Sequence, residues 1–124
     1  SKNGVKFYSD NAIVKNNPSV GNISNHIRIK KVVLDYDATE VVFEAIENGY
    51  DWISINRQSY LFYKGNKYML KSANGIKYSP EKTMMTGGNR EFSLIFEPLP
   101  MTASSFVFSE GNNGWFANNI RIQD

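Results

Sequence analysis

The sequence predicts an all-β domain of about seven to nine antiparallel strands, folded as a sandwich or barrel. Two observations lead to this fold class. Apolar residues recur with a period of two in short runs that are rich in Val, Ile, Phe and Tyr, which is the spacing of strands. Gly, Asn and Pro cluster between these runs, at residues 16–22, 47–51, 86–90 and 110–114, where we expect turns.

The expected strands follow one another along the chain, each marked by apolar residues two positions apart. Residues 40–48 could also form a short helical stripe, but Val41 and Val42 are β-branched and favour a strand. Pro98 and Pro100 cannot donate to a ladder and should end the strand before them. The marker residues are Val5 and Phe7, Ile27 and Ile29, Val41 and Phe43, Ile53 and Ile55, Phe92, Leu94 and Phe96, Phe106 and Phe108, and Ile120 and Ile122.

The sharpest local signal is a hairpin in the segment YKGNKY. Gly65-Asn66 fits a two-residue type II′ turn, in which the leading glycine takes a positive φ. Gly87-Gly88 is interpreted as a second hairpin turn, since no Lys-Ser ending follows it to make a phosphate-binding loop. In the first hairpin we expect Tyr63 opposite Tyr68, Leu61 opposite Leu70, and Phe62 opposite Met69.

The size and charge of the chain indicate a single domain, residues 1–124. With 41% apolar and 21% charged residues, 124 residues can bury a core. The formal net charge of +2 is too small for electrostatic capture of nucleic acid. No apolar run approaches the roughly 20 residues that cross a bilayer, and the first residues lack the layout of a signal peptide. We therefore expect no nucleic-acid partner and no transmembrane segment.

The residues that carry chemistry are few, so we expect no catalytic residue, no cofactor and no metal site. Cysteine is absent, which excludes disulfides and thiolate zinc sites. His26 is the only histidine, and we expect it to be at least half-exposed where a strand begins. Asp35 and Asp37 are spaced like the start of a calcium loop, but the glycine at the sixth position and the distal glutamate are missing. A polar connection between two strands explains the same residues.

Four aromatic residues beside turns are the candidate ligand-binding residues: Tyr50, Trp52, Trp115 and Phe116. Tryptophan beside a turn can form a flat platform for sugar rings. Large aromatic side chains in a sandwich of this size more often fill the space between the sheets, so we favour burial of both tryptophans. For the closing segment we also expect Ile120 and Ile122 to pack inward.

A resemblance covers the chain from about Trp52 to Ile122. It rests on the segments WISIN, YLFYKGNKYMLKSANGI, EFSLIFEPLPMTASSFVFSEG and GWFANNIRI, and residues 91–111 are the most specific part. Here the chain resembles immunoglobulin-like domains of uncharacterised secreted or lipid-anchored proteins of Bacteroidetes. The resemblance implies an immunoglobulin-like β-sandwich and a periplasmic, cell-surface or secreted location. It brings no catalytic residues.

Three classes of function remain open, and a non-enzymatic one is favoured. The first is a binding or spacer module of the cell envelope or a secreted protein, whose partner is an unidentified protein or glycan. The alternative is a carbohydrate-binding module that uses exposed aromatic residues. A glycosidase-like or metal-dependent enzyme is the third, and it lacks a recognisable nucleophile, base and orienting group. Whether Trp52 and Trp115 are buried discriminates between the first two.

Overall fold

The computed structural model describes residues 8–47, 49 and 51–124, which form ten β-strands and no helix. The predicted all-β class is confirmed. The strand count exceeds the prediction because two short strands, at Ile13–Asn16 and Thr83–Met84, have no alternating apolar residues to mark them. The expected strand around Val5 and Phe7 lies outside the described residues. The strands are β1 (Ile13–Asn16), β2 (Ile27–Leu34), β3 (Thr39–Ala45), β4 (Trp52–Ile53), β5 (Tyr60–Tyr63), β6 (Asn66–Asn74), β7 (Thr83–Met84), β8 (Arg90–Phe96), β9 (Ser105–Ser109) and β10 (Phe116–Arg121).

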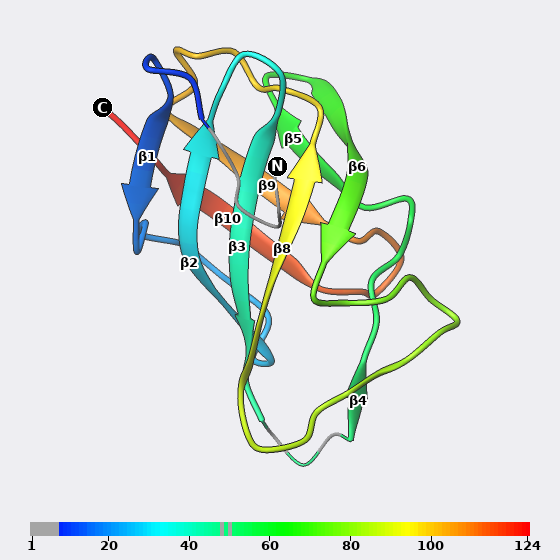
Figure 1. The fold of residues 1–124 in the computed structure, drawn as a ribbon. Coiled ribbons are helices and arrows are strands. Elements are labelled where there is room, and N and C mark those ends of the chain that lie inside the picture. The colour runs from blue at the N-terminus through cyan, green and yellow to red at the C-terminus, as the bar shows by residue number, and fades with distance from the viewer. Residues whose placement is uncertain (1–7, 48, 50) are drawn as a thin grey trace.

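Eight strands form one antiparallel sheet that folds over into two layers. The strand order is β1-β2-β3-β8-β6-β5-β9-β10. Strand β6 belongs to both layers: its first half pairs with β5, and its second half pairs with β8 after a register shift between Leu70 and Ser72. In Figure 1, β10 and β9 cross behind β2, β3 and β8 at an angle. The result is a sandwich whose layers share one strand.

The neighbour relations agree with those of a constant-type immunoglobulin domain. Such a domain has strands A-B-E-D in one sheet and C-F-G in the other. Here β2-β3-β8-β6 occupy the places of the first set, and β5-β9-β10 those of the second. Strand β1 is an addition at the edge, and β4 pairs with β7 in a separate two-stranded sheet.

The core lies between the two layers and is built mainly from the inward positions of β2, β3, β8, β9 and β10, with partly buried residues of β6 packed against it. Phe43 of β3 is fully buried, with its ring 5.1 Å from that of Phe92 and 4.9 Å from that of Phe108. Because Phe108 belongs to β9 in the second layer, these rings join the layers directly. Ile120 and Ile122 are buried in the same cluster, as predicted for the closing segment. Removal of water from this surface is the main stabilising force.

Two local predictions about strands are confirmed. Residues 39–45 form strand β3, not a helix, and its central position between β2 and β8 buries apolar side chains on both faces. This burial explains why its sequence reads as a nearly continuous apolar run. Strand β8 ends at Phe96, directly before the two prolines, and the next strand begins at Ser105.

The turn between β5 and β6 differs in type from the prediction. Its central residues are Lys64 and Gly65, with φ of 45° and 83°, which makes it type I′. Gly65 does have the predicted positive φ, but as the second central residue. The turn therefore lies one residue earlier than predicted and the strand register is wrong by two residues, because Lys64 adopts the left-handed conformation that side chains usually avoid. The observed pairs are Tyr60–Met69, Leu61–Tyr68, Phe62–Lys67 and Tyr63–Asn66.

The glycine pair at residues 87–88 does not form a hairpin turn, which corrects the second turn prediction. Strand β7 before it pairs with β4, and strand β8 after it pairs with β3 and β6. Both glycines have positive φ, 87° and 106°, so the residues suit a reversal of direction. The two glycines connect the small sheet to the sandwich. The prediction failed because the sequence of a turn does not show whether the strands on either side of it pair with each other.

The connection between β1 and β2 covers the outer edge of β10. Isolated bridges pair Ser19 with Arg121 and Ile23 with Ala117. Backbone hydrogen bonds of 2.8 Å from Gly21 to Asn118 and 2.7 Å from Asn118 to Asn22 continue this contact. An edge strand that is covered in this way cannot pair with another chain.

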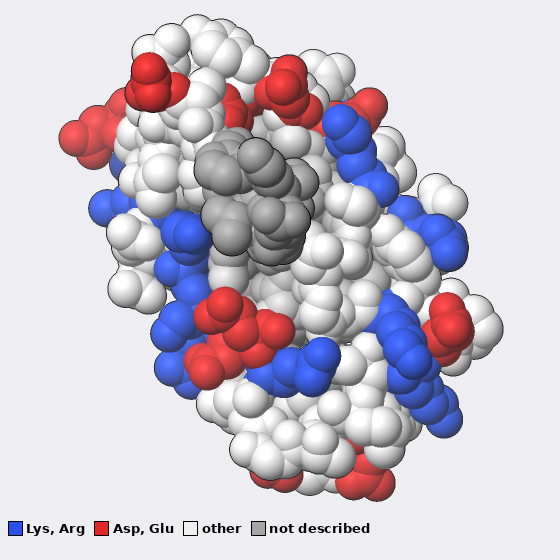
Figure 2. Space-filling model, in the orientation of Figure 1, with Lys and Arg blue, Asp and Glu red and all other residues white. Residues whose placement is uncertain are grey.

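The face shown in Figure 2 carries both basic and acidic side chains, and the two kinds are interspersed. The described residues contain no helix long and apolar enough to cross a membrane.

Candidate functional site

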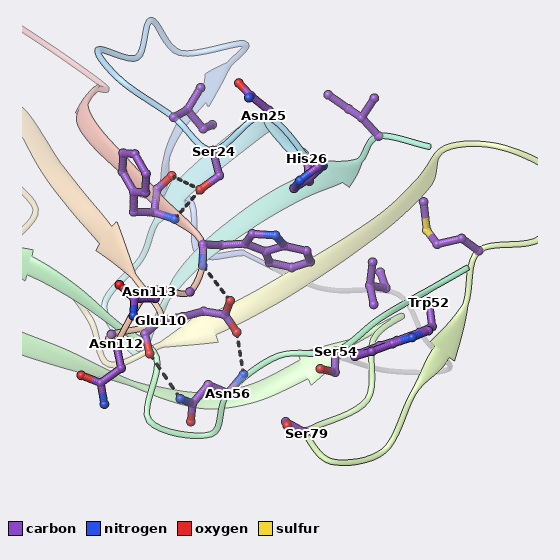
Figure 3. Close-up of a pocket in the computed structure, with 18 residues that line it drawn as sticks. Ser24, Asn25, His26, Trp52, Ser54, Asn56, Ser79, Glu110, Asn112 and Asn113 are labelled. Carbon is purple, nitrogen blue, oxygen red and sulfur yellow. Dashed lines mark hydrogen bonds between the residues drawn. The ribbon is translucent and has the colours of Figure 1, made fainter. Parts of the chain in front are cut away.

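A cleft of about 870 Å³ lies at one end of the sandwich. Ile46, directly after β3, and His26, directly before β2, both line it, so it lies where these two strands end and begin. The remaining walls come from β4 and the segment after it, and from the loop between β9 and β10 (Figure 3). Its lining residues are Ile23, Ser24, Asn25, His26, Ile46, Trp52, Ile53, Ser54, Asn56, Ser79, Met85, Glu110, Gly111, Asn112, Asn113, Gly114, Trp115 and Phe116.

The structure brings together three of the four aromatic residues nominated from the sequence. Trp52, Trp115 and Phe116 all line this cleft, although more than 60 residues separate the first from the other two. The fourth, Tyr50, lies outside the described residues.

Trp52 is exposed, which corrects the expectation that it belongs to the core. Its side chain retains 43% of its accessible surface, whereas the next residue, Ile53, is buried. The reason is that β4 pairs only with β7, away from the sandwich, so no second sheet covers the face that carries Trp52. The Nζ atom of Lys82 lies 4.7 Å from the centroid of the indole, within the range of a cation–π interaction.

Trp115 is half-buried, so it belongs to the edge of the core and also presents aromatic surface to the cleft. Its ring stacks on that of Phe92, with centroids 5.8 Å apart and planes inclined by 22°, and so joins the edge of the core. The remainder of its surface lines the cleft. Stacking on a buried ring fixes its orientation, and a ligand therefore meets a preorganised aromatic surface.

Phe116 is the third aromatic residue of the cleft and is 39% exposed. Ser24 holds its backbone, because the Ser24 hydroxyl accepts a bond of 2.9 Å from the Phe116 N–H. The same hydroxyl lies 3.3 Å from the Phe116 carbonyl, to which it donates. The serine therefore ties the start of β10 to the segment before β2 on the opposite wall.

Glu110 joins two walls of the cleft through its carboxylate. One oxygen accepts a hydrogen bond of 2.9 Å from the Asn56 N–H, and the other accepts one of 2.9 Å from the Trp115 N–H. The Asn56 side-chain amide in turn donates to the Glu110 carbonyl at 3.3 Å. Figure 3 shows Glu110 and Asn56 facing each other across this contact. Hydrogen bonds to an ionised group are among the stronger ones in proteins.

The polar lining of the cleft is mostly uncharged. Its amides and hydroxyls are Asn25, Asn56, Asn112, Asn113, Ser24, Ser54 and Ser79. Among the described lining residues, Glu110 is the only carboxylate, and backbone N–H groups engage both of its oxygens. Amides and hydroxyls can both donate and accept hydrogen bonds, so the lining suits a neutral ligand with many hydroxyl groups.

A second, shallower hollow of about 400 Å³ adjoins the cleft. The two share Ile23, Ser24, Asn25 and Ile46 as lining residues. The hollowed surface therefore continues past the first cleft along the segment before β2.

His26 and Asp35, two candidates for metal binding or catalysis, lie just beyond opposite ends of β2. His26 is half-buried at the wall of the cleft, as expected for a residue that enters a strand. Asp35 is in the turn between β2 and β3, where its carboxylate accepts bonds of 2.9 Å and 2.5 Å from the backbone N–H and hydroxyl of Ser9. These bonds lower the pKa of Asp35. Within the described part of the chain, no three His, Cys, Asp or Glu side chains are grouped to hold a metal ion.

Sequence reasoning missed Ser24, Asn56 and Glu110, which hold the aromatic residues in place. The only signal near them is the turn-rich composition of residues 110–114. That composition predicts a loop but not a partner more than 50 residues away.

Comparison of the chain with protein-family models, with curated proteins and with solved structures finds no match.

Proposed function

We propose that this domain is a non-enzymatic carbohydrate-binding module that takes a neutral glycan in the cleft at the end of the sandwich. The observation that carries the proposal is the convergence of Trp52, Trp115 and Phe116 on one cleft. Sugar rings have one apolar face and a rim of hydroxyl groups. An exposed indole can cover the face while neighbouring amides and hydroxyls bind the rim.

The size of the cleft supports a ligand of several sugar units. Small-molecule sites typically enclose about 300–1,000 Å³, and this cleft is near the upper end at about 870 Å³. The adjoining hollow extends the available surface. An oligosaccharide that lies along both should therefore bind better than a monosaccharide of the same type.

The place of the cleft within the strand order also supports a binding role. The loops that frame it connect β3 to β5 and β9 to β10. In the immunoglobulin comparison these are the B–C and F–G loops, which carry antigen-binding residues in variable domains. The analogy concerns only the end of the sandwich that is used, since one fold supports many functions.

The cellular location follows from the resemblance noted in residues 52–122, and it completes the proposal. A module of the cell envelope, or of a secreted protein, meets glycans outside the cytoplasm. The domain then acts by binding, and it does not cleave what it holds.

Affinity electrophoresis against a panel of soluble neutral polysaccharides tests the proposal. We expect at least one polysaccharide to retard the wild-type domain, and Trp52→Ala to weaken that binding about tenfold, which corresponds to about 1.4 kcal/mol. Phe62→Ala is the matched control. Phe62 is equally exposed, at 41%, but lies on β5 and does not line the cleft.

Two results would overturn the proposal. The first is the absence of binding to every neutral polysaccharide, or equal binding by Trp52→Ala and wild type. The second is hydrolysis of a bound glycan that a single carboxylate substitution abolishes, which would make the domain an enzyme.

A further inference from the structure

Hydrogen bonds between Glu110 and Asn56 attach the loop between β9 and β10 to the facing wall of the cleft. Within the loop, the Glu110 N–H donates to the Trp115 carbonyl at 2.9 Å, and the Gly114 N–H donates to the Gly111 carbonyl at 2.8 Å. These bonds close the loop on itself. The link to the wall on the other side runs through the Glu110 carboxylate and carbonyl, both of which bind Asn56.

We propose that Glu110 is a positioning residue, which sets the distance between the Trp115 wall and the Trp52 wall. This inference rests on the proposed function, because it concerns how the same cleft holds its ligand. The carboxylate bonds to Asn56 on one side and to Trp115 on the other, and Asn56 is four residues after Trp52. Two aromatic surfaces carried by separate loops can bind one glycan chain only while their spacing is fixed.

The glycine at position 114 shows how closely the loop fits this carboxylate. A Cβ atom at Gly114 would lie 2.6 Å from the Glu110 Cβ and 2.9 Å from its Oε1. Both distances are shorter than any normal contact, so a larger residue would displace the glutamate side chain. Space is therefore reserved for the carboxylate at the position where it meets the Trp115 N–H.

Replacing Glu110 with glutamine keeps the size of the side chain but removes one of its acceptors. A carboxylate accepts from both N–H groups, whereas the amide nitrogen of glutamine can only donate. One of the two N–H groups, from Asn56 or from Trp115, must then lose its partner. The side chain then no longer bridges Asn56 and Trp115, although its volume is unchanged and the bond from the Asn56 side-chain amide to the residue 110 carbonyl is kept.

Glu97→Gln is the matched control for this substitution. The Glu97 carboxylate also accepts a bond from a backbone N–H, that of Met69, at 2.7 Å. It lies directly after β8, at the opposite end of that strand from Arg90, and it does not line the cleft. If the loss of such a hydrogen bond has a general effect on the domain, both variants show it. A loss of glycan affinity that is caused by the position of the cleft walls appears only in Glu110→Gln.

The experiment combines hydrogen exchange with glycan binding. In the wild-type domain, we expect slow exchange of the Asn56 and Trp115 amides, measured by NMR without ligand. In Glu110→Gln, at least one of the two should exchange about tenfold faster or more. Affinity for the retarding polysaccharide should fall about five- to tenfold, while Glu97→Gln binds like the wild type and both variants keep a cooperative thermal transition.

Hydrogen exchange and glycan binding together show which of the two proposals fails, glycan binding by the domain or the positioning role of Glu110. If no polysaccharide binds but the two amides lose protection in Glu110→Gln, the proposed function is wrong and the link itself stands. If Glu110→Gln binds as tightly as the wild type, or if both amides stay protected, Glu110 does not position the cleft. Should Glu110→Gln fail to fold, Gly114→Ala provides the same test by displacing the carboxylate without removing it.

Discussion

The body of the sandwich and its loop end are held together by different forces. In the body, inward side chains such as Phe43 and Leu94 are fully buried and interlock across the layers. At the loop end, Trp52 and Phe116 remain exposed, and side-chain hydrogen bonds from Ser24 and Glu110 hold the backbone there. The difference indicates that stability is concentrated in the body, whereas the loop end carries the proposed binding residues. Substitutions in the two regions should therefore have separable effects.

The largest effect should follow from truncating a ring that joins the layers. Phe43→Ala should lower the free energy of unfolding by about 3–5 kcal/mol, because it leaves a cavity between Phe92 and Phe108. Urea unfolding followed by circular dichroism measures the change. Phe62→Ala on the outer face of β5 is the comparison and should change stability by about 0.5 kcal/mol or less. If both variants lost the same free energy of unfolding, the distinction between the core and the surface would be wrong.

A smaller effect is expected at the turn between β5 and β6. Gly65→Val should destabilise the domain by about 1–2 kcal/mol, since a β-branched residue is strained at a φ of 83°. A Cβ atom at this position meets nothing within 4 Å, so the cost comes from the backbone alone. Gly65→Asn tests this cause, because asparagine tolerates the left-handed conformation and should recover most of the loss. If both variants unfold at the same urea concentration, backbone strain is not the reason.

One polar contact in the body of the sandwich, between Tyr8 and Glu40, should make the free energy of unfolding depend on pH. The Tyr8 hydroxyl donates to Glu40, which is buried on β3, and burial together with this bond raises the pKa of Tyr8. Above the ordinary tyrosine pKa of about 10, the folded state keeps a proton that the unfolded state has lost. The free energy of unfolding should therefore fall as pH rises through this window.

Tyr8→Phe isolates that contribution. Urea unfolding at about pH 8 and about pH 11 should show a smaller alkaline loss in the variant than in the wild type, because the other tyrosines contribute equally to both. Parallel losses in the two proteins would mean that the bond to Glu40 does not persist in solution.

The smallest stability effect is expected at the loop end. Trp52→Ala should change the free energy of unfolding by about 0.5 kcal/mol or less, since the indole is exposed and β4 pairs only with β7. The same variant is expected to lose glycan binding, so stability and affinity would separate in one substitution. A loss of about 2 kcal/mol or more would show that the small sheet supports the sandwich.

The sequence correctly predicts strand position and burial where these depend on the spacing of neighbouring residues. Alternation in residues 92–96 identified β8 and its buried face, and the two prolines after it marked its end. The exposure of Trp52 was not predictable in this way. A period of two shows which side chains share a face, but not whether another sheet covers that face.

The candidate site was predictable only as a set of residue types. Trp52, Trp115 and Phe116 stood out as aromatic residues beside turns, and two segments far apart in the sequence bring them together. Glu110 gave no signal, because its partners Asn56 and Trp115 are set by the path of two loops. The turn type at Gly65 was missed for a related reason: either type of turn gives this glycine a positive φ, and only the conformation of Lys64 distinguishes them.

The contact between the β1–β2 connection and β10 has a consequence for how the chain folds. Ser19 pairs with Arg121 and Ile23 with Ala117, so about 100 residues must be in place before these contacts close. Such long-range pairing slows folding, because the entropy of a large loop is lost before the contact is gained. During synthesis, residues 19–23 therefore lack their partner until residues 117–121 have been added. We expect this edge of the domain to form in a late step of folding.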